Sequence, residues 1–157
     1  MAIYHLSMKI ISRGNKQNAV ASAAYRSGEK LVDVQSGEVK NYPREVQPET
    51  HILAPTNAPN WVYDRQTLWN NVEKVEKRVN SQLSRELEIA LPIELNHEQQ
   101  TELIKEFIQD NCVNKGMIAD ISIHRDNEEN PHAHVMLTMR EISRYGFQEK
   151  NRDWNHV

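Results

Sequence analysis

The sequence predicts an α+β fold, a two-layer member of the broad α/β class, in which a central and largely antiparallel sheet has its helices packed on one face. Segments in which apolar and polar residues alternate are separated by segments with helical spacing, as at 84–91 and 64–79. Each strand-like segment has only one apolar face, which is typical of antiparallel sheets. A polar loop of only seven residues, 125–131, separates two such segments and indicates a hairpin.

Length and composition indicate one domain, 1–157, which we expect to be the N-terminal part of a longer protein. With 157 residues, of which 38% are hydrophobic, the chain can bury a two-layer core. We expect a cytoplasmic protein without membrane insertion, because no apolar run reaches the ~18 residues of a spanning helix and no export signal is present. The single cysteine excludes a disulfide framework and a multi-cysteine zinc site. The net charge of −3 argues against a protein that coats nucleic acid through bulk charge.

Local signals indicate where the elements begin and end. Gly28 is placed to end an alanine-rich helix, Asp64 to cap the clearest helix, and Asn96 with Gln99 to form a capping box. The polar segment after Arg140 indicates no clear terminal element. The expected helices lie at 18–27, 64–79 and 96–116, and the expected strands at 3–11, 31–34, 38–42, 51–53, 84–91, 117–124 and 132–139.

Two histidines share one face of the last expected strand. His132 and His134 alternate with Ala133 and Val135, so the apolar pair faces the core and the histidines face the other side. His124 lies on the polar face of the preceding strand, and the short hairpin puts it opposite, or nearly opposite, His132. A His-x-His pair alone is usually not a metal site. Three imidazoles, however, suit a divalent metal and leave coordination positions for water or a phosphate oxygen.

Polar side chains of the other strands are expected on this same sheet face. Many titratable groups on one face indicate a functional site. Taken singly, Tyr25 is most simply a packing residue at a helix end, and Arg78 is part of the polar face of its helix. The residues expected on the uncovered face are His5, Ser7, Lys9, Glu86, Glu88, Asp120, His124, His132 and His134.

Three stretches of the chain, in sequence order, are MAIYHLSMKIISRGNKQNAVASAAYRSGEKL, LSRELEIALP and ADISIHRDNEENPHAHVMLTMR. Together they resemble the MobA/MobL family of plasmid mobilisation relaxases, within the HUH endonucleases. The likeness runs from Ile3 to about Arg140 and is closest to the nicking enzymes of staphylococcal and related Gram-positive conjugative plasmids. Ala133 is the hydrophobic residue of the His-hydrophobic-His pattern that names the superfamily.

The resemblance implies a fold of the HUH relaxase type and a tyrosine-dependent reaction. Tyr25 matches the nucleophile that attacks a phosphodiester at the nic site of an origin of transfer. The attack would leave a 5′-phosphotyrosyl link and a free 3′-hydroxyl, and the strand could later be rejoined. Glu86 and Arg78 match residues of the catalytic centre, and the division of roles between Glu86 and Glu88 stays open.

The resemblance also implies a metal, a substrate and partners. A divalent metal, Mg²⁺ or Mn²⁺ in catalysis, would bind His124, His132 and His134, although imidazoles also fit a transition metal such as Ni²⁺ or Zn²⁺. The substrate would be single-stranded or hairpin-flanking oriT DNA, because a tyrosine cannot align with a phosphate inside a stable duplex. Relaxosome accessory proteins and coupling proteins are the expected partners. The candidate DNA contacts are His5, Ser7, Lys9, Arg13, Lys16 and Arg26.

Two other functions remain open at the level of the sequence. In a rolling-circle-type or other metal-dependent nuclease, the histidines would activate water and Tyr25 would be structural. In a DNA-binding module, the metal would be inert or structural and no strand would be cut. A covalent protein–DNA adduct distinguishes the relaxase from both.

Overall fold

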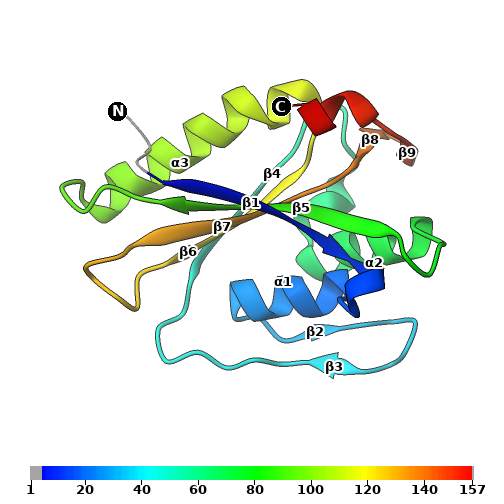
Figure 1. The fold of residues 1–157 in the computed structure, drawn as a ribbon, viewed down its shortest axis with the longest axis horizontal. Coiled ribbons are helices and arrows are strands. Elements are labelled where there is room, and N and C mark those ends of the chain that lie inside the picture. The colour runs from blue at the N-terminus through cyan, green and yellow to red at the C-terminus, as the bar shows by residue number, and fades with distance from the viewer. Residues whose placement is uncertain (1–4, 157) are drawn as a thin grey trace.

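A five-stranded antiparallel sheet forms the centre of the structure (Figure 1), a computed structural model that describes residues 5–156. The strand order is β1-β5-β7-β6-β4, and each neighbouring pair runs antiparallel. The α+β class and the antiparallel sheet expected from the sequence are therefore confirmed. The strands are β1 (Leu6–Ser12), β4 (Glu49–Leu53), β5 (Gln82–Ala90), β6 (Ala119–His124) and β7 (His132–Leu137).

Helices and two small hairpins surround this sheet. The helices are α1 (Ala19–Ser27), α2 (Arg65–Val75) and α3 (His97–Asn111), and the short 3₁₀ turns are η1 (Arg13–Asn15), η2 (Asn60–Tyr63), η3 (Val113–Lys115) and η4 (Arg152–His156). The hairpins join β2 (Leu31–Val32) to β3 (Val39–Lys40) and β8 (Arg140–Ser143) to β9 (Gly146–Lys150). Within residues 5–156, no helix has the length and apolar character needed to cross a membrane.

The local signals in the sequence set the ends of most elements. Gly28 follows α1 with a φ of 73°, a left-handed conformation that glycine adopts without steric cost. Asp64 caps α2, and the expected capping box begins α3. However, α2 ends at Val75 rather than at Val79, and Val79 is 86% exposed in the following loop. The expected strand at 3–11 corresponds to β1, and its first two residues lie outside the described part of the chain.

Helices cover both faces of the sheet, whereas we expected them on one face only (Figure 1). On one face, Ile104 and Ile108 of α3 pack with Ile89 of β5 in a buried apolar cluster. On the other face, Trp69 of α2 packs with residues of α1 and with Met136 of β7 in a second cluster. The sheet is therefore the middle layer between two cores.

The sheet face that looks polar in the sequence is covered because its polar side chains find partners on α1 and α2. Asp120, only 3% exposed, accepts hydrogen bonds of 2.8 Å from the Arg65 guanidinium and from Nε1 of Trp69, both on α2. Glu86 is fully buried and pairs with Arg26 of α1. The free-energy cost of burying a polar side chain is small when such hydrogen-bond partners are present. The alternation of polar and apolar residues in the sequence does not show partners that come from distant segments, so this face was expected to be uncovered.

The C-terminal segment forms β8, β9 and η4, where the sequence indicated no clear element. Ile142 and Phe147 pack against the core under α1 and α2, and Trp154 packs into the core under α3. Each short element contributes only one or two apolar side chains among charged residues. This is why no periodic signal was visible there.

The ion pair between Arg65 and Asp120 supports a first prediction about stability. Replacing Asp120 with alanine leaves Nε and Nη2 of the buried Arg65 and the Trp69 N–H without their acceptor, and only the partly exposed Glu29 still pairs with Arg65. We expect the Asp120→Ala variant to lose about 3–5 kcal/mol in the free energy of unfolding, measured by urea denaturation. Asp110→Ala, at an exposed position of α3, is the control and should change it by about 0.5 kcal/mol or less. A similar small loss for both variants would contradict the role of this pair.

Candidate active site

Three imidazoles meet on the sheet face that carries α1 and α2. His124 at the end of β6 pairs directly with His132 at the start of β7, and His134 follows two positions later. The ring centroids are 4.7–5.2 Å apart, and one nitrogen from each ring lies within 4.8 Å of the others. The pairing predicted from the hairpin is therefore confirmed. We call these three residues the histidine triad.

Hydrogen bonds assign the nitrogens of two of the rings. Nε2 of His124 lies 2.7 Å from the carbonyl oxygen of Arg26, and Nδ1 of His132 lies 2.9 Å from that of Asn130. A carbonyl only accepts, so each of these nitrogens carries the proton and donates. Nδ1 of His124 and Nε2 of His132 are then left with free lone pairs. Such backbone contacts are the usual way in which metal-binding imidazoles are oriented.

A buried carboxylate lies beside the third ring. Glu86 of β5 is fully buried, and its Oε2 lies 3.6 Å from Nδ1 of His134 and accepts a hydrogen bond from Nε of Arg26. Lys9 of β1 lies 3.3 Å from Oε1 of the same carboxylate. Glu88 is more exposed, and its Oε1 lies 3.8 Å from Nε2 of His134. Glu86 therefore joins β1, α1 and the triad, while Glu88 lies at the rim.

The electrostatics keep two rings of the triad, those of His124 and His134, in the neutral form that binds metal. Burial lowers the pKa of His124 to about 4; its neighbouring histidines and Arg44 act in the same direction, and the hydrogen bond that His124 donates to the Arg26 carbonyl opposes them. Burial likewise lowers the pKa of His134 to about 4, with Glu88 opposing the shift. Both rings are therefore neutral at pH 7. A divalent metal at about 2.1 Å from each nitrogen needs them about 3–3.5 Å apart, which modest ring rotations would provide.

Tyr25 lies in the last turn of α1, one residue before the carbonyl that His124 contacts. Its side chain is 55% exposed. Its ring and that of Tyr42 meet edge to face at a centroid distance of 5.6 Å, and the Arg44 guanidinium lies 4.9 Å from the Tyr25 centroid. Sequence reasoning missed both neighbours, because the segment between β3 and β4 is irregular and has no periodic pattern. The structure thus brings Tyr25 and the triad to the same side of the sheet.

Comparison with known proteins identifies the family. The model of the MobA/MobL family matches residues 17–156, most of the chain. This chain belongs to the MobA/MobL family. The matched span includes Tyr25, Glu86 and the histidine triad.

Curated MobA/MobL relatives are named for conjugal transfer and mobilisation. "Conjugal transfer protein TraA" of Rhizobium radiobacter is 40% identical over 162 residues, which cover 96% of this chain and 14% of the relative. "Mobilization protein MobL" of Acidithiobacillus ferridurans is 38% identical over 125 residues, which cover 79% of this chain and 32% of the relative. The chain therefore spans only a minor part of the length of either relative.

A solved structure described as "Molecular Basis of Vancomycin Resistance Transfer in Staphylococcus aureus" has the same fold. Its TM-score is 0.89 and its identity 40%, and the match covers 98% of this chain and 82% of that one. The likeness to a staphylococcal protein expected from the sequence is confirmed. The rhizobial relative has the same identity to this chain as the staphylococcal structure.

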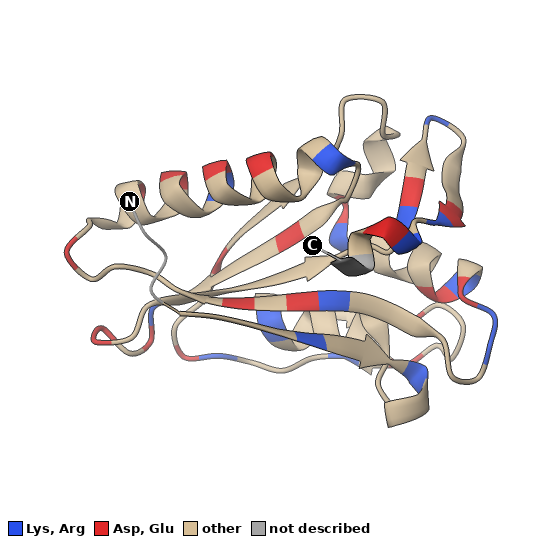
Figure 2. Ribbon diagram, turned by 45° about the horizontal axis from the view of Figure 1, so that its top comes forward, with Lys and Arg blue, Asp and Glu red and all other residues tan. Residues whose placement is uncertain are grey.

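Three of the candidate DNA contacts of this MobA/MobL chain lie at the exposed edge of the sheet. His5, Ser7 and Lys9 are all exposed, and Ser7 and Lys9 pair with Glu88 and Glu86 in the β1–β5 register. Their side of the sheet is the triad side. Acidic residues recur along α3 on the opposite face (Figure 2), so part of the negative charge of the chain lies away from the triad.

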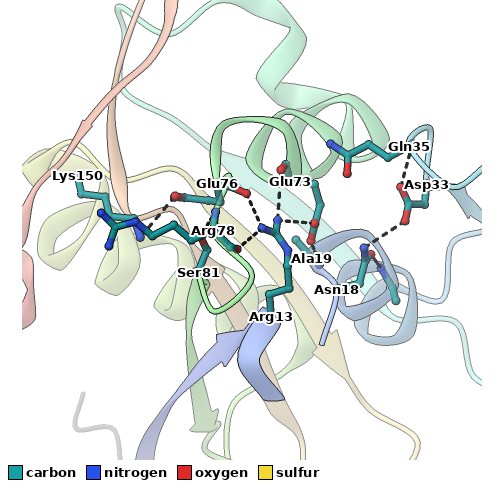
Figure 3. Close-up of polar contacts among 11 residues, drawn as sticks. Arg13, Asn18, Ala19, Asp33, Gln35, Glu73, Glu76, Arg78, Ser81 and Lys150 are labelled. Carbon is teal, nitrogen blue, oxygen red and sulfur yellow. Dashed lines mark hydrogen bonds and ion pairs between the residues drawn. The ribbon is translucent and has the colours of Figure 1, made fainter. Parts of the chain in front are cut away.

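Arg26 and Arg13, by contrast, are occupied within the protein. Arg26 pairs with Glu86, and its side chain is only 13% exposed. Arg13 donates to the Glu73 carboxylate and to the carbonyl oxygens of Glu76 and Arg78, the latter two at 2.6 Å (Figure 3). These bonds hold the chain where it leaves α2. Both arginines therefore stabilise the fold around the site, and their guanidinium groups are not presented to a ligand.

Lys16 and Arg78 are exposed, and Arg78 lies apart from the triad. Arg78 follows α2 in the loop before β5, whereas Glu88, the partner of His134, lies six residues beyond Gln82, roughly 20 Å along β5. The structure does not bring Arg78 to the predicted catalytic centre. It lines a hollow of about 660 Å³ whose basic residues are Lys77, Arg78, Arg140, Lys150 and Arg152.

The triad geometry gives a prediction about metal affinity. His132→Ala removes one of three nitrogen ligands, and we expect untagged protein to bind Ni²⁺ at least about 10-fold more weakly, measured by isothermal titration calorimetry. The matched control is His97→Ala, which removes an exposed histidine at the start of α3. Equal affinity of His132→Ala and the wild type would show that the triad is not the metal site.

Proposed function

We propose that this chain is a relaxase domain that nicks single-stranded DNA at a plasmid origin of transfer and can rejoin it. The observation that carries the proposal is the contact of His124 of the triad with the backbone carbonyl of Arg26, the residue that follows Tyr25. Membership of a family whose relatives are named for conjugal transfer and mobilisation supports the biological setting. The relatives are much longer, so the activity of a whole protein is part of the proposal.

In the proposed reaction, the phenolic oxygen of Tyr25 attacks the scissile phosphorus. A bond forms between Oη and phosphorus, the bond from phosphorus to the 3′-oxygen breaks, and the phenolic proton is lost while the 3′-oxygen gains one. A divalent metal bound by the triad would neutralise the charge of the phosphate and orient it. Because a phenolate is a better leaving group than an alkoxide, the released 3′-hydroxyl can reverse the step and reseal the strand.

The buried Glu86 acts in this proposal by holding other groups. It is positioned to orient the imidazole of His134 and to keep the side chain of Arg26 beneath α1. The helix that carries Tyr25 is thereby fixed on the triad side. Glu88, being more exposed, is left to interact with the approaching substrate or its metal.

We propose single-stranded or hairpin-flanking oriT DNA as the substrate, since in-line attack needs an unpaired strand. The exposed side chains of His5, Ser7, Lys9 and Lys16 are the proposed contacts to its backbone. We propose that Arg78 contacts a phosphate farther along the DNA and has no catalytic role, since it is exposed in a basic hollow.

The fuller proposal is a cytoplasmic protein that uses Mg²⁺ or Mn²⁺, tolerates Ni²⁺ or Zn²⁺ in the site, and works with relaxosome accessory and coupling proteins.

The alternative is a metal-dependent nuclease in which the triad activates water. It would leave free DNA ends and no covalent adduct. Tyr25 has an exposed ring and directly precedes the residue whose carbonyl His124 contacts, which favours the tyrosine mechanism, because a purely structural tyrosine is normally packed. The two functions therefore differ in one product that can be measured.

We expect Tyr25→Phe to abolish adduct formation and to leave affinity for single-stranded DNA within about 2-fold, because only the attacking hydroxyl is removed. The assay mixes protein, Mg²⁺ or Mn²⁺ and 3′-labelled oligonucleotides that tile the non-coding DNA beside the gene, and it detects an SDS-resistant band. Tyr145→Phe, a change at another exposed tyrosine, should behave like the wild type. Wild-type levels of adduct from Tyr25→Phe would mean that another residue is the nucleophile.

A further inference from the structure

An irregular segment of the chain crosses the end of the helix that carries Tyr25. Residues 41–47, between β3 and β4, form this segment, which we call the strap (Figure 1). Nε and Nη2 of Arg44 donate to the carbonyl oxygen of Tyr25 at 2.9 and 2.7 Å. Nε2 of Gln47 donates to the carbonyl oxygen of Ser27 at 3.0 Å. The strap therefore supplies donors to carbonyls that the end of a helix leaves without intrahelical partners.

The strap also holds the tyrosine ring itself. The guanidinium carbon of Arg44 lies 4.9 Å from the centroid of the Tyr25 ring, and Tyr42 meets the ring edge to face, with planes 73° apart. Because Tyr25 is 55% exposed, little else restrains its orientation. Arg44 is the residue that contacts both the backbone and the ring of Tyr25. Gln47 bonds to Ser27 at the same helix end and makes no hydrogen bond to Tyr25, which makes it a matched control.

We propose that Arg44 is a positioning residue for Tyr25, which limits the rotamers of the ring and keeps its hydroxyl directed at the triad side. This inference rests on the proposed function only for its effect on rate. A side chain on a surface helix otherwise samples several staggered rotamers, and only a fraction of these would be in line with a phosphate. The planar fork of arginine can donate two bonds and stack at the same time, which lysine cannot do.

The kinetic test uses Arg44→Lys, because this change keeps the positive charge. We expect the single-turnover rate constant of adduct formation at saturating DNA to fall about 10-fold, with the Kd for DNA changed less than about 2-fold. Gln47→Ala should keep the wild-type rate constant. An unchanged rate constant in Arg44→Lys overturns the proposal, as does an equal loss in Gln47→Ala, which would indicate a general role of the strap in stability. A change confined to the Kd would show instead that Arg44 contacts DNA.

A second measurement needs no activity and separates this inference from the proposed function. Tyrosine ring carbons are labelled with ¹³C, and the Tyr25 signals are assigned by their absence in Tyr25→Phe. We expect Arg44→Lys to move these signals toward those of the exposed Tyr63, and Gln47→Ala to leave them in place. Unchanged Tyr25 signals in Arg44→Lys overturn the positioning role. If the ring is released but the wild type forms no adduct, the positioning role stands and the proposed function fails.

Discussion

The hydrogen bond from Nε2 of His124 to the carbonyl oxygen of Arg26 is the contact on which the rest of the candidate site depends. It joins the end of β6 to the last turn of α1, two segments that are 98 positions apart in the sequence. It also assigns the proton of the ring, so that Nδ1 is the nitrogen left for a metal. The same bond therefore sets both the ligand geometry and the side from which Tyr25 approaches.

The packing of α1 on the polar face of the sheet maintains the contact between His124 and Arg26. α1 lies close to the sheet because it buries small residues such as Ala23 and Ala24. Its N-terminus is held by the Glu73 carboxylate, which accepts from the backbone N–H of Ala19, and near its C-terminus Arg26 pairs with Glu86. Buried ion pairs add little to the net free energy of folding, but a buried charge left without its partner is costly, so each pair favours the one arrangement in which both charges are paired. The charges on this face thus orient the helix, while the apolar clusters provide the stability.

Local rules were enough to predict the histidine hairpin. Strand alternation and a seven-residue loop allow few strand registers, and in these His124 and His132 lie opposite or nearly opposite each other. The helix caps followed from equally local patterns. Contacts between distant segments were not predictable in this way. The role of Arg13 depends on acceptors more than 60 positions away, Arg78 was misplaced because α2 ends early, and Arg44 lies in a segment without periodicity.

The central claim is that α1 presents Tyr25 to a metal held by the triad, and paramagnetic relaxation by Mn²⁺ tests it most directly. The effect falls steeply with distance, so a bound Mn²⁺ broadens only nearby signals. With ¹³C-labelled tyrosine rings, the account predicts that substoichiometric Mn²⁺ removes the Tyr25 signal while that of Tyr145, in the β8–β9 turn, persists. The broadening should disappear in a His134→Ala variant. A sharp Tyr25 signal in wild-type protein whose triad is loaded with Mn²⁺ would contradict the account.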